Sequence, residues 1–360
     1  MTLTTSAPAP LWNPDEDETL VCCAVRAETH DVKTFIFQAP EPRRFAYEPG
    51  QFMTFTLTIG GEEIHRCYTL SSSPTRPDRV SITVKRIGEG PVSSWLHANL
   101  VPGTSIKALG PMGDFFCTAK TSSKYLFLSA GSGITPLMSM TRSHHDLGSC
   151  ADIAFVHSAR SPADLIFRDE LDLMVKTAKA IGPGLAVTAI CEADSDGEVW
   201  SGPRGRIDLA KLEAIAPDFR ERDVYICGPA PYMAAVKAML EASGYDMARY
   251  HSESFDFAEL SADQAEPEAA TSGQGFKVEF KLSRRTIEVA PDRFILAAAK
   301  AEGMRLPSSC TKGMCGTCKC KLVSGTVDMT PAGGIRQREI DQGMILICCS
   351  KPTSDLVLER

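Results

Sequence analysis

The chain has 360 residues, more than one compact core usually accommodates, and its formal net charge of −7 argues against a protein that neutralises nucleic-acid phosphates. It has neither a run of about eighteen apolar residues nor a basic and then apolar N-terminus, so we expect no membrane span, no secretory signal and a cytoplasmic location. In that reducing compartment, thirteen cysteines favour metal-binding or redox thiols over disulfides.

After an N-terminal extension over residues 1–17, the first predicted domain covers residues 18–120. Its short segments alternate apolar and polar residues, are rich in β-branched residues and are separated by turn sequences, which is typical of an antiparallel β-barrel. The predicted strands are residues 20–28, 34–39, 52–59, 66–72, 79–87 and 105–110. A helix over residues 92–100 interrupts them.

The pattern changes in the second predicted domain, residues 121–256. Continuous apolar strands now alternate with helical stretches, which indicates an α/β domain whose parallel sheet is covered by helices on both faces. The predicted strands are residues 124–131, 153–159, 185–193 and 223–229, and the predicted helices are residues 133–146, 164–180 and 230–244.

Residues 257–275 contain no Lys or Arg and few apolar residues, so we predict a mobile linker there. The last domain, residues 276–360, is predicted to contain a hairpin over residues 276–282 and 285–290 and a helix over residues 294–303. It has a net charge of +5, against −12 for the rest of the chain.

The most specific motif of the sequence is a cysteine loop in this last domain. Cys310, Cys315 and Cys318 have the spacing C-x4-C-x2-C, and Cys348 follows on a predicted strand. This arrangement matches a plant-type [2Fe-2S] site. A zinc site is the alternative, although zinc frameworks usually pair two short C-x2–4-C units.

Two neighbouring cysteines are left over by that pattern. Cys320 lies on the strand that leaves the loop, where strand alternation would put it on the same face as Cys318. The same alternation would turn Cys349 away from Cys348.

Residues 306–325 and 345–355 resemble the cluster-binding loop and closing strand of plant-type ferredoxins. The resemblance implies an α+β domain of the β-grasp type with Cys310, Cys315, Cys318 and Cys348 as the cluster ligands. The domain departs from acidic photosynthetic ferredoxins because Arg305, Lys312 and Lys319 lie beside the ligands, so we expect its partner to present an acidic docking surface.

Two segments of the first domain suit a flavin. The segment from Arg66 to Thr69 supplies a guanidinium for a phosphate, the Tyr68 ring for a flat heterocycle and a hydroxyl for a ring nitrogen. The segment from Gly90 to Ser94 opens a helix and can form a phosphate-binding nest. The alternative is that its serine only caps the helix and binds no ligand.

Together these segments resemble the flavin domain of the ferredoxin-NADP reductase superfamily. The resemblance implies a flavin held by Arg66, Cys67, Tyr68, Thr69, Lys85, Gly90, Val92 and Ser93. FAD is favoured over FMN because the turn from Gly90 to Ser94 suits a pyrophosphate.

Glycine-rich turns at strand ends in the second domain predict a nicotinamide nucleotide site. Gly131, Ser132, Gly133 and Thr135 lie between a strand and a helix, where glycines let a pyrophosphate approach the helix N-terminus, but alone they are a weak motif. By resemblance to the same superfamily, Cys227, Gly228 and Pro229 border the nicotinamide, and Glu253 and Phe255 flank the flavin. Thr69, Cys227 and Glu253 are therefore the expected catalytic residues. Arg160 follows the second strand and is a single cation for a 2′-phosphate, so we favour NADH over NADPH.

Residues 20–360 as a whole resemble the reductase components of Rieske-type oxygenases, in particular those that serve demethylating monooxygenases of glycine betaine or stachydrine. The resemblance implies electron transfer from NADH through flavin and the [2Fe-2S] cluster to the oxygenase. The related reductase of hybrid-cluster protein is the alternative. Two other classes stay open: a zinc-stabilised interaction module joined to a nucleotide-binding domain, and a flavin oxidase or flavohaem-like reductase that uses oxygen directly.

Overall fold

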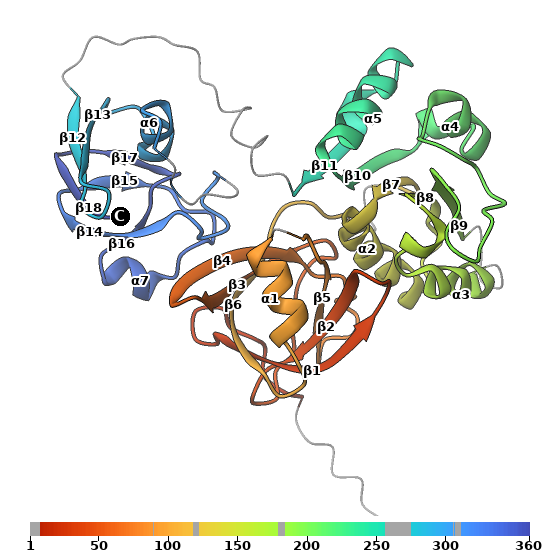
Figure 1. The fold of residues 1–360 in the computed structure, drawn as a ribbon, viewed down its shortest axis with the longest axis horizontal. Coiled ribbons are helices and arrows are strands. Elements are labelled where there is room, and N and C mark those ends of the chain that lie inside the picture. The colour runs from red at the N-terminus through yellow and green to blue at the C-terminus, as the bar shows by residue number, and fades with distance from the viewer. Residues whose placement is uncertain are drawn as a thin grey trace, which may run out of the picture.

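The structure, a computed structural model, describes residues 8–88, 90–117, 122–178, 184–255, 275–304, 306 and 311–360. Cys310, Arg305, residues 1–7 and residues 257–274 of the expected linker lie outside the described residues. The described chain forms three domains. The N-terminal barrel lies between a parallel-sheet domain and the C-terminal domain (Figure 1).

The first domain is an antiparallel sheet that closes into the predicted barrel. Its elements are β1 (Thr19–Ala27), β2 (Val32–Gln38), β3 (Phe52–Ile59), β4 (Glu62–Thr69), β5 (Val80–Lys85), α1 (Pro91–Asn99) and β6 (Ser105–Met112). The strand order is β4-β3-β6-β1-β2-β5, and a bridge between Leu70 and Ile82 joins its two ends. Phe35, Phe37 and Phe55 are fully buried in the interior, because alternate residues of each strand face inward.

Part of the expected N-terminal extension packs on this barrel. Trp12 lies in the barrel core, and its indole Nε1 donates a hydrogen bond of 2.9 Å to the carbonyl oxygen of Gly110. Leu11 forms a bridge with Arg44. The segment before β1 therefore belongs to the packed structure from at least Leu11 onward.

The second domain has the predicted parallel sheet. Its elements are β7 (Lys124–Ala130), η1 (Gly131–Gly133), α2 (Ile134–Asp146), β8 (Asp152–Ala159), η2 (Pro162–Asp164), α3 (Arg168–Ala178), β9 (Leu185–Cys191), α4 (Leu209–Ile215), η3 (Phe219–Glu221), β10 (Asp223–Gly228), α5 (Ala230–Ala242), η4 (Met247–Arg249) and β11 (Tyr250–Ser254). The strand order is β11-β10-β7-β8-β9, and separate apolar cores cover its two faces. The edge strand β11 was not predicted as a strand.

The C-terminal domain is the predicted α+β domain. Its elements are β12 (Phe276–Phe280), β13 (Arg285–Val289), α6 (Ile295–Ala301), β14 (Lys319–Ser324), β15 (Val327–Met329), α7 (Gln337–Asp341), β16 (Met344–Leu346), β17 (Ser350–Pro352) and β18 (Leu356–Glu359). The main sheet has the order β13-β12-β18-β14-β16, and β15 pairs with β17. Across the described part of the chain, no helix is long and apolar enough to cross a membrane.

The prediction that Cys348 lies on a strand is wrong. Residues 347–349 form a turn between β16 and β17, closed by a hydrogen bond from the Cys349 N–H to the carbonyl oxygen of Leu346. Cys318 likewise precedes β14. Strand alternation therefore decides neither the direction of Cys349 relative to Cys348 nor that of Cys320 relative to Cys318.

Candidate functional site

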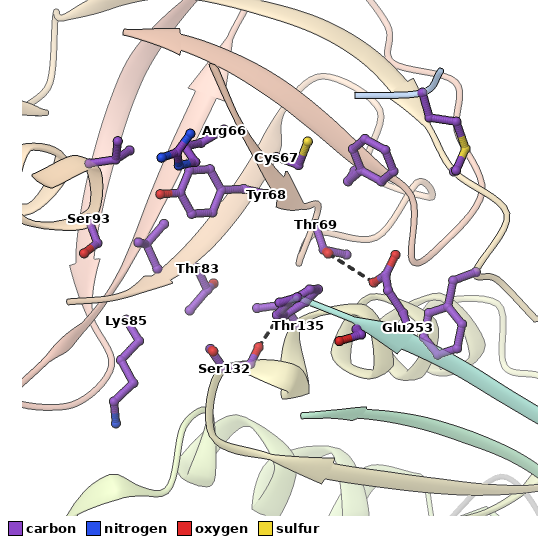
Figure 2. A pocket seen from close by; sticks show the side chains of 18 of the residues that line it. Arg66, Cys67, Tyr68, Thr69, Thr83, Lys85, Ser93, Ser132, Thr135 and Glu253 are labelled. Atoms are coloured by element: carbon purple, nitrogen blue, oxygen red, sulfur yellow. Dashed lines mark hydrogen bonds between the residues drawn. The ribbon is translucent and has the colours of Figure 1, made fainter. Parts of the chain in front are cut away.

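A cavity of about 580 Å³ lies where all three domains meet. The barrel, β11 and the start of α2 supply most of its walls (Figure 2). Lys312 and Met314 reach it from the cysteine loop. The predicted site residues that line it are Arg66, Cys67, Tyr68, Thr69, Lys85, Gly90, Val92, Ser93, Ser132, Thr135, Glu253 and Phe255.

Strand β4 forms one wall of the cavity because its last four residues end at the barrel rim. The Tyr68 ring packs edge-on against Phe55, with ring centroids 6.1 Å apart, and burial raises the pKa of Tyr68 far above its usual value. The Arg66 guanidinium donates 2.8 Å to the carbonyl oxygen of His65. The wall thus combines a flat, neutral aromatic surface with a permanent cation.

The end of the cavity away from Glu253 carries further groups expected at a phosphate, Lys85 and Ser93 (Figure 2). Lys85 Nζ lies 3.0 Å from Asp31 Oδ2, so its charge is already partly balanced. The Ser93 hydroxyl accepts 3.0 Å from the N–H of Ile87, so it orders the turn before α1. Gly90 is the N-cap residue of that helix, in extended conformation.

Glu253 brings a carboxyl from β11 to the barrel rim. The Thr69 hydroxyl donates to Glu253 Oε2 at 3.4 Å (Figure 2). Glu253 as a whole is half-buried, because it borders the cavity, but its carboxyl is surrounded by protein atoms. This burial raises the pKa of Glu253 to about 8, although the hydrogen bond from Thr69 acts in the opposite direction. Glu253 is therefore mostly protonated at neutral pH.

The glycine turn after β7 packs tightly on the end of β10. A Cβ added at Gly133 would lie 2.3 Å from the carbonyl oxygen of Cys227 and 2.5 Å from the nitrogen of Gly228. The Thr135 hydroxyl donates 3.1 Å to the carbonyl oxygen of Ser132 and holds the turn onto α2. Cys227 is fully buried, and burial, followed by the nearby Glu253, raises its pKa well above the usual range.

Several predicted nucleotide residues do not line the cavity: Gly131, Gly133, Arg160, Cys227, Gly228 and Pro229. Gly131 and Gly133 follow the end of β7, and the segment from Cys227 to Pro229 lies at the end of β10. These two strand ends are neighbours because β7 and β10 pair directly. Arg160 follows β8 and is exposed. The carboxyl ends of parallel strands are where nucleotides bind in such sheets.

Sequence reasoning missed several residues that line the cavity: Phe52, Thr83, Val84, Ile87, Pro91, Gly113, Asp114, Phe115, His251, Ser252, Ser254, Lys312 and Met314. Those on barrel strands belong to ordinary alternating strands with no motif of their own. Lys312 and Met314 stand within the cysteine motif, but nothing local indicates that this loop reaches the barrel.

Three of the four predicted metal ligands converge in the C-terminal domain. Cys315, Cys318 and Cys348 are all buried. The thiols of Cys318 and Cys348 are hydrogen-bonded to each other, and this contact, with burial, raises the pKa of Cys318 far above its usual range. Converging buried thiols are the soft donor set that iron-sulfur clusters require. The fourth ligand, Cys310, lies outside the described residues.

Glycines allow this loop to fold so tightly. Gly313 and Gly316 both have φ of +72°, a conformation that other residues rarely adopt. A Cβ at Gly313 would lie 2.8 Å from the Cys349 sulfur, and one at Gly316 would lie 2.7 Å from the carbonyl oxygen of Gly334. The described thiols and the cavity therefore fit an iron-sulfur cluster and a flat, phosphate-bearing cofactor.

Family models match all three domains. An oxidoreductase FAD-binding domain matches residues 22–117, an oxidoreductase NAD-binding domain matches residues 127–238, and a 2Fe-2S iron-sulfur cluster binding domain matches residues 279–353. These matches follow the barrel, the parallel-sheet domain and the C-terminal domain in order.

Relatives are similar over nearly the whole chain. The glycine betaine monooxygenase reductase subunit of Pseudomonas aeruginosa is 45% identical, with 94% of each chain covered. The stachydrine N-demethylase reductase subunit of Rhizobium meliloti is 39% identical, covering 95% of this chain and 96% of its own. Among solved structures, phthalate dioxygenase reductase shares the fold, with a TM-score of 0.58, 23% identity and coverage of 97% of this chain and 100% of its own. The chain therefore belongs to the family of monooxygenase reductase subunits, oxidoreductases that combine FAD-binding, NAD-binding and 2Fe-2S cluster-binding domains.

Proposed function

We propose that this protein passes electrons from NADH through FAD and a [2Fe-2S] cluster to a Rieske-type oxygenase, specifically a demethylating monooxygenase of a quaternary ammonium compound. The observation that carries this proposal is the cavity at which the barrel, the nucleotide-binding edge and the cysteine loop meet. The glycine betaine and stachydrine relatives support the substrate class of the partner. We place this activity in the cytoplasm, where buried free thiols stay reduced.

The chain's own residues would hold and orient the flavin. Arg66 and the turn from Gly90 to Ser93 would take the pyrophosphate, and the Tyr68 ring would cover one face of the isoalloxazine. Thr69 and the protonated Glu253 would offer hydrogen bonds at its reactive edge. When bound, FAD supplies the exchange between two-electron hydride chemistry and one-electron transfer.

The strand ends of the parallel sheet would hold NADH. The turn from Gly131 to Gly133 would accept the pyrophosphate at the start of α2, and the Cys227–Pro229 turn would border the nicotinamide. Arg160 is a single exposed cation, which supports NADH over NADPH as the coenzyme.

The partner would present an acidic docking surface to the C-terminal domain. Residues 276–360 have a net charge of +5, and Lys312 and Lys319 flank the cluster ligands. Opposite charge on the two surfaces would speed their encounter and select the partner. Raising the ionic strength should then slow electron transfer to the oxygenase while leaving NADH oxidation by ferricyanide nearly unchanged.

Removal of residues 258–360 tests whether the first two domains oxidise NADH on their own and whether the C-terminal domain is needed to reduce a protein acceptor. The shortened protein keeps the barrel and the parallel-sheet domain, so we expect NADH-dependent ferricyanide reduction to persist. Reduction of cytochrome c should be lost with the cluster. Equal loss of both activities would contradict the proposed path, and absorption spectra of the full chain before and after NADH would show whether flavin and cluster are both present.

The pKa of Glu253 predicts a pH dependence of the flavin potential. The Glu253 pKa is raised to about 8, so the carboxyl is neutral below that pH and becomes negative above it. A negative charge beside the flavin disfavours added electrons, so the midpoint potential should fall more steeply above pH 8 than below it. Spectroelectrochemical titration from pH 6 to 10 measures this break.

Glu253→Gln should remove the break, because the amide does not titrate. Asp114→Asn changes another carboxyl that lines the cavity and is exposed there, and it should keep the break. A break that survives in Glu253→Gln would show that a different group titrates.

A further inference from the structure

The C-terminal domain is held on the barrel by a buried arginine. The side chain of Arg336 is 9% exposed. Its Nε donates 2.5 Å to the carbonyl oxygen of Pro14, and its Nη2 donates 3.1 Å to that of Ala108 and 3.4 Å to that of Asp17. Ala108 lies in β6 of the barrel, and Pro14 and Asp17 belong to the N-terminal segment just before β1, so one guanidinium satisfies several of its donors across the interface.

The same arginine is connected to the cysteine loop. Arg336 is the N-cap residue of α7, and its backbone N–H donates 2.8 Å to Glu339 Oε2 in the first turn of that helix. Glu339 Oε1 lies 2.7 Å from Lys319 Nζ. Lys319 directly follows the predicted ligand Cys318. A continuous set of polar contacts thus runs from the barrel through Arg336 to the loop.

Two further contacts seat the loop itself on the barrel. The Thr54 hydroxyl of β3 donates 3.0 Å to the carbonyl oxygen of Cys315. Met314 packs against a small apolar cluster of Phe52, Leu109 and Met112, and it also lines the flavin cavity. The contact is therefore polar at Arg336 and Thr54, and apolar next to the cavity.

This seating covers the cysteine loop. Between Thr311 and Cys318, Lys312 is the exposed residue, Met314 is half-buried and the others are buried. Lys319 is engaged by Glu339, and the exposed Lys312 lines the cavity where the domains meet, so neither lysine beside the ligands lies on an open outer face of the molecule. Electron transfer weakens steeply with distance, so an external acceptor protein gains little by approaching a cluster whose loop faces the barrel.

We propose that Arg336 is the positioning residue that seats the C-terminal domain on the barrel for flavin-to-cluster transfer, and that the acceptor protein uses the same loop face after the domain has left the barrel. The inference rests on the proposed function. In the seated state the flavin loses one electron and the [2Fe-2S] centre gains it. In the released state the cluster is oxidised and the acceptor protein is reduced.

The first experiment compares Arg336→Ala, Arg336→Lys and Thr54→Val in the full, cofactor-loaded chain, with Arg293→Ala as the control. Arg293 is an exposed arginine of the same domain. Loss of hydrogen bonds to a charged group should weaken seating and slow cluster reduction by NADH about 10- to 100-fold in Arg336→Ala, and less in Arg336→Lys. Stopped-flow absorption should show an unchanged rate of flavin reduction.

Hydrogen exchange gives a readout that does not depend on turnover. Amides of residues 311–318 should exchange faster in Arg336→Ala and Thr54→Val than in wild type or Arg293→Ala, while the visible spectrum of the cluster stays the same. Thr54 is on the barrel side, so its change cannot act by unfolding the C-terminal domain. Unchanged loop exchange and unchanged cluster reduction would overturn the positioning role. Failure of NADH to reduce any flavin would instead contradict the proposed function.

A second experiment tests release. Arg338 Nη2 lies 2.6 Å from Glu18 Oε2 across the same interface, so Arg338→Lys would put an amine beside this carboxylate for carbodiimide crosslinking. The crosslinked protein should still reduce its cluster quickly, but its transfer to cytochrome c should fall at least about tenfold relative to wild type treated in the same way. Undiminished transfer would show that the acceptor uses another face.

Discussion

Replacing Cys348 by serine should abolish the visible and paramagnetic signals of the cluster and lower cytochrome c reduction by roughly 100-fold or more, with ferricyanide reduction retained. The Cys348 thiol is buried and hydrogen-bonded to that of Cys318, so it lies where the proposed ligands converge. A serine hydroxyl is a harder ligand that gives up its proton far less readily than a thiol. Optical and paramagnetic spectra of the purified, reconstituted variant measure the loss.

Cys320→Ser is the matched control. Cys320 is as buried as Cys348, at 3% against 4% exposure, and lies on the strand that leaves the loop. Its serine variant should lose some stability but keep both cluster signals, because Cys320 lies outside the ligand spacing. If Cys320→Ser lost the signals and Cys348→Ser kept them, the proposed ligand set would be wrong.

The strand pattern of the barrel and the strand–helix pattern of the parallel sheet could be predicted because both are local. Alternation over residues such as 52–59 and continuous apolar runs such as 125–128 reflect which side of each strand is buried. The edge strand β11 escaped prediction because its sequence, YHSES, is polar and its residues are only partly buried or exposed. It is a strand because it pairs with β10. This pairing joins residues far apart in the sequence, and it places Glu253 beside Cys227.

The segment around Cys348 shows the opposite error. Residues 345–349 are continuously apolar, which is typical of a buried strand, yet the chain turns at residues 347–349. Residues before the turn are buried because they pack in the sheet, whereas the cysteines within the turn are buried because their thiols converge. Both requirements select apolar residues, so composition alone does not show where the strand ends. The cysteine spacing itself is local, so it indicates a ligand set without any knowledge of this turn.

Residues that reach the cavity from another domain could not be predicted from local sequence. Lys312 and Met314 line it because the C-terminal domain packs on the barrel, and Asp114 and Phe115 line it because the chain passes there between two domains. The Arg-x-Tyr-Thr segment was recognisable only by its resemblance to a known pattern. Its residues gain their arrangement from the pairing of β4 with β3 along the whole strand.

Gly133→Ala should lower the rate of flavin reduction by NADH by about 100-fold and the free energy of unfolding by about 1–3 kcal/mol. Gly133 has φ of −64°, which alanine accepts, so the cost comes from the clash of the new Cβ with the backbone of Cys227 and Gly228. Those atoms belong to β10, which is held between β11 and β7, so the start of α2 must move instead, together with the turn that would hold the pyrophosphate. Stopped-flow reduction by NADH and thermal unfolding measure the two effects.

Reduction by dithionite separates this cause from damage to the flavin site. It needs no nucleotide, so its extent should be normal in Gly133→Ala. Gly148→Ala, just beyond the other end of α2, is the matched variant: its φ is +59° and nothing lies within 4 Å of the added Cβ. It should cost about 1 kcal/mol through backbone strain while leaving the NADH reaction unchanged. If Gly133→Ala behaved like Gly148→Ala, the close packing of the turn on β10 would not be what positions the nucleotide.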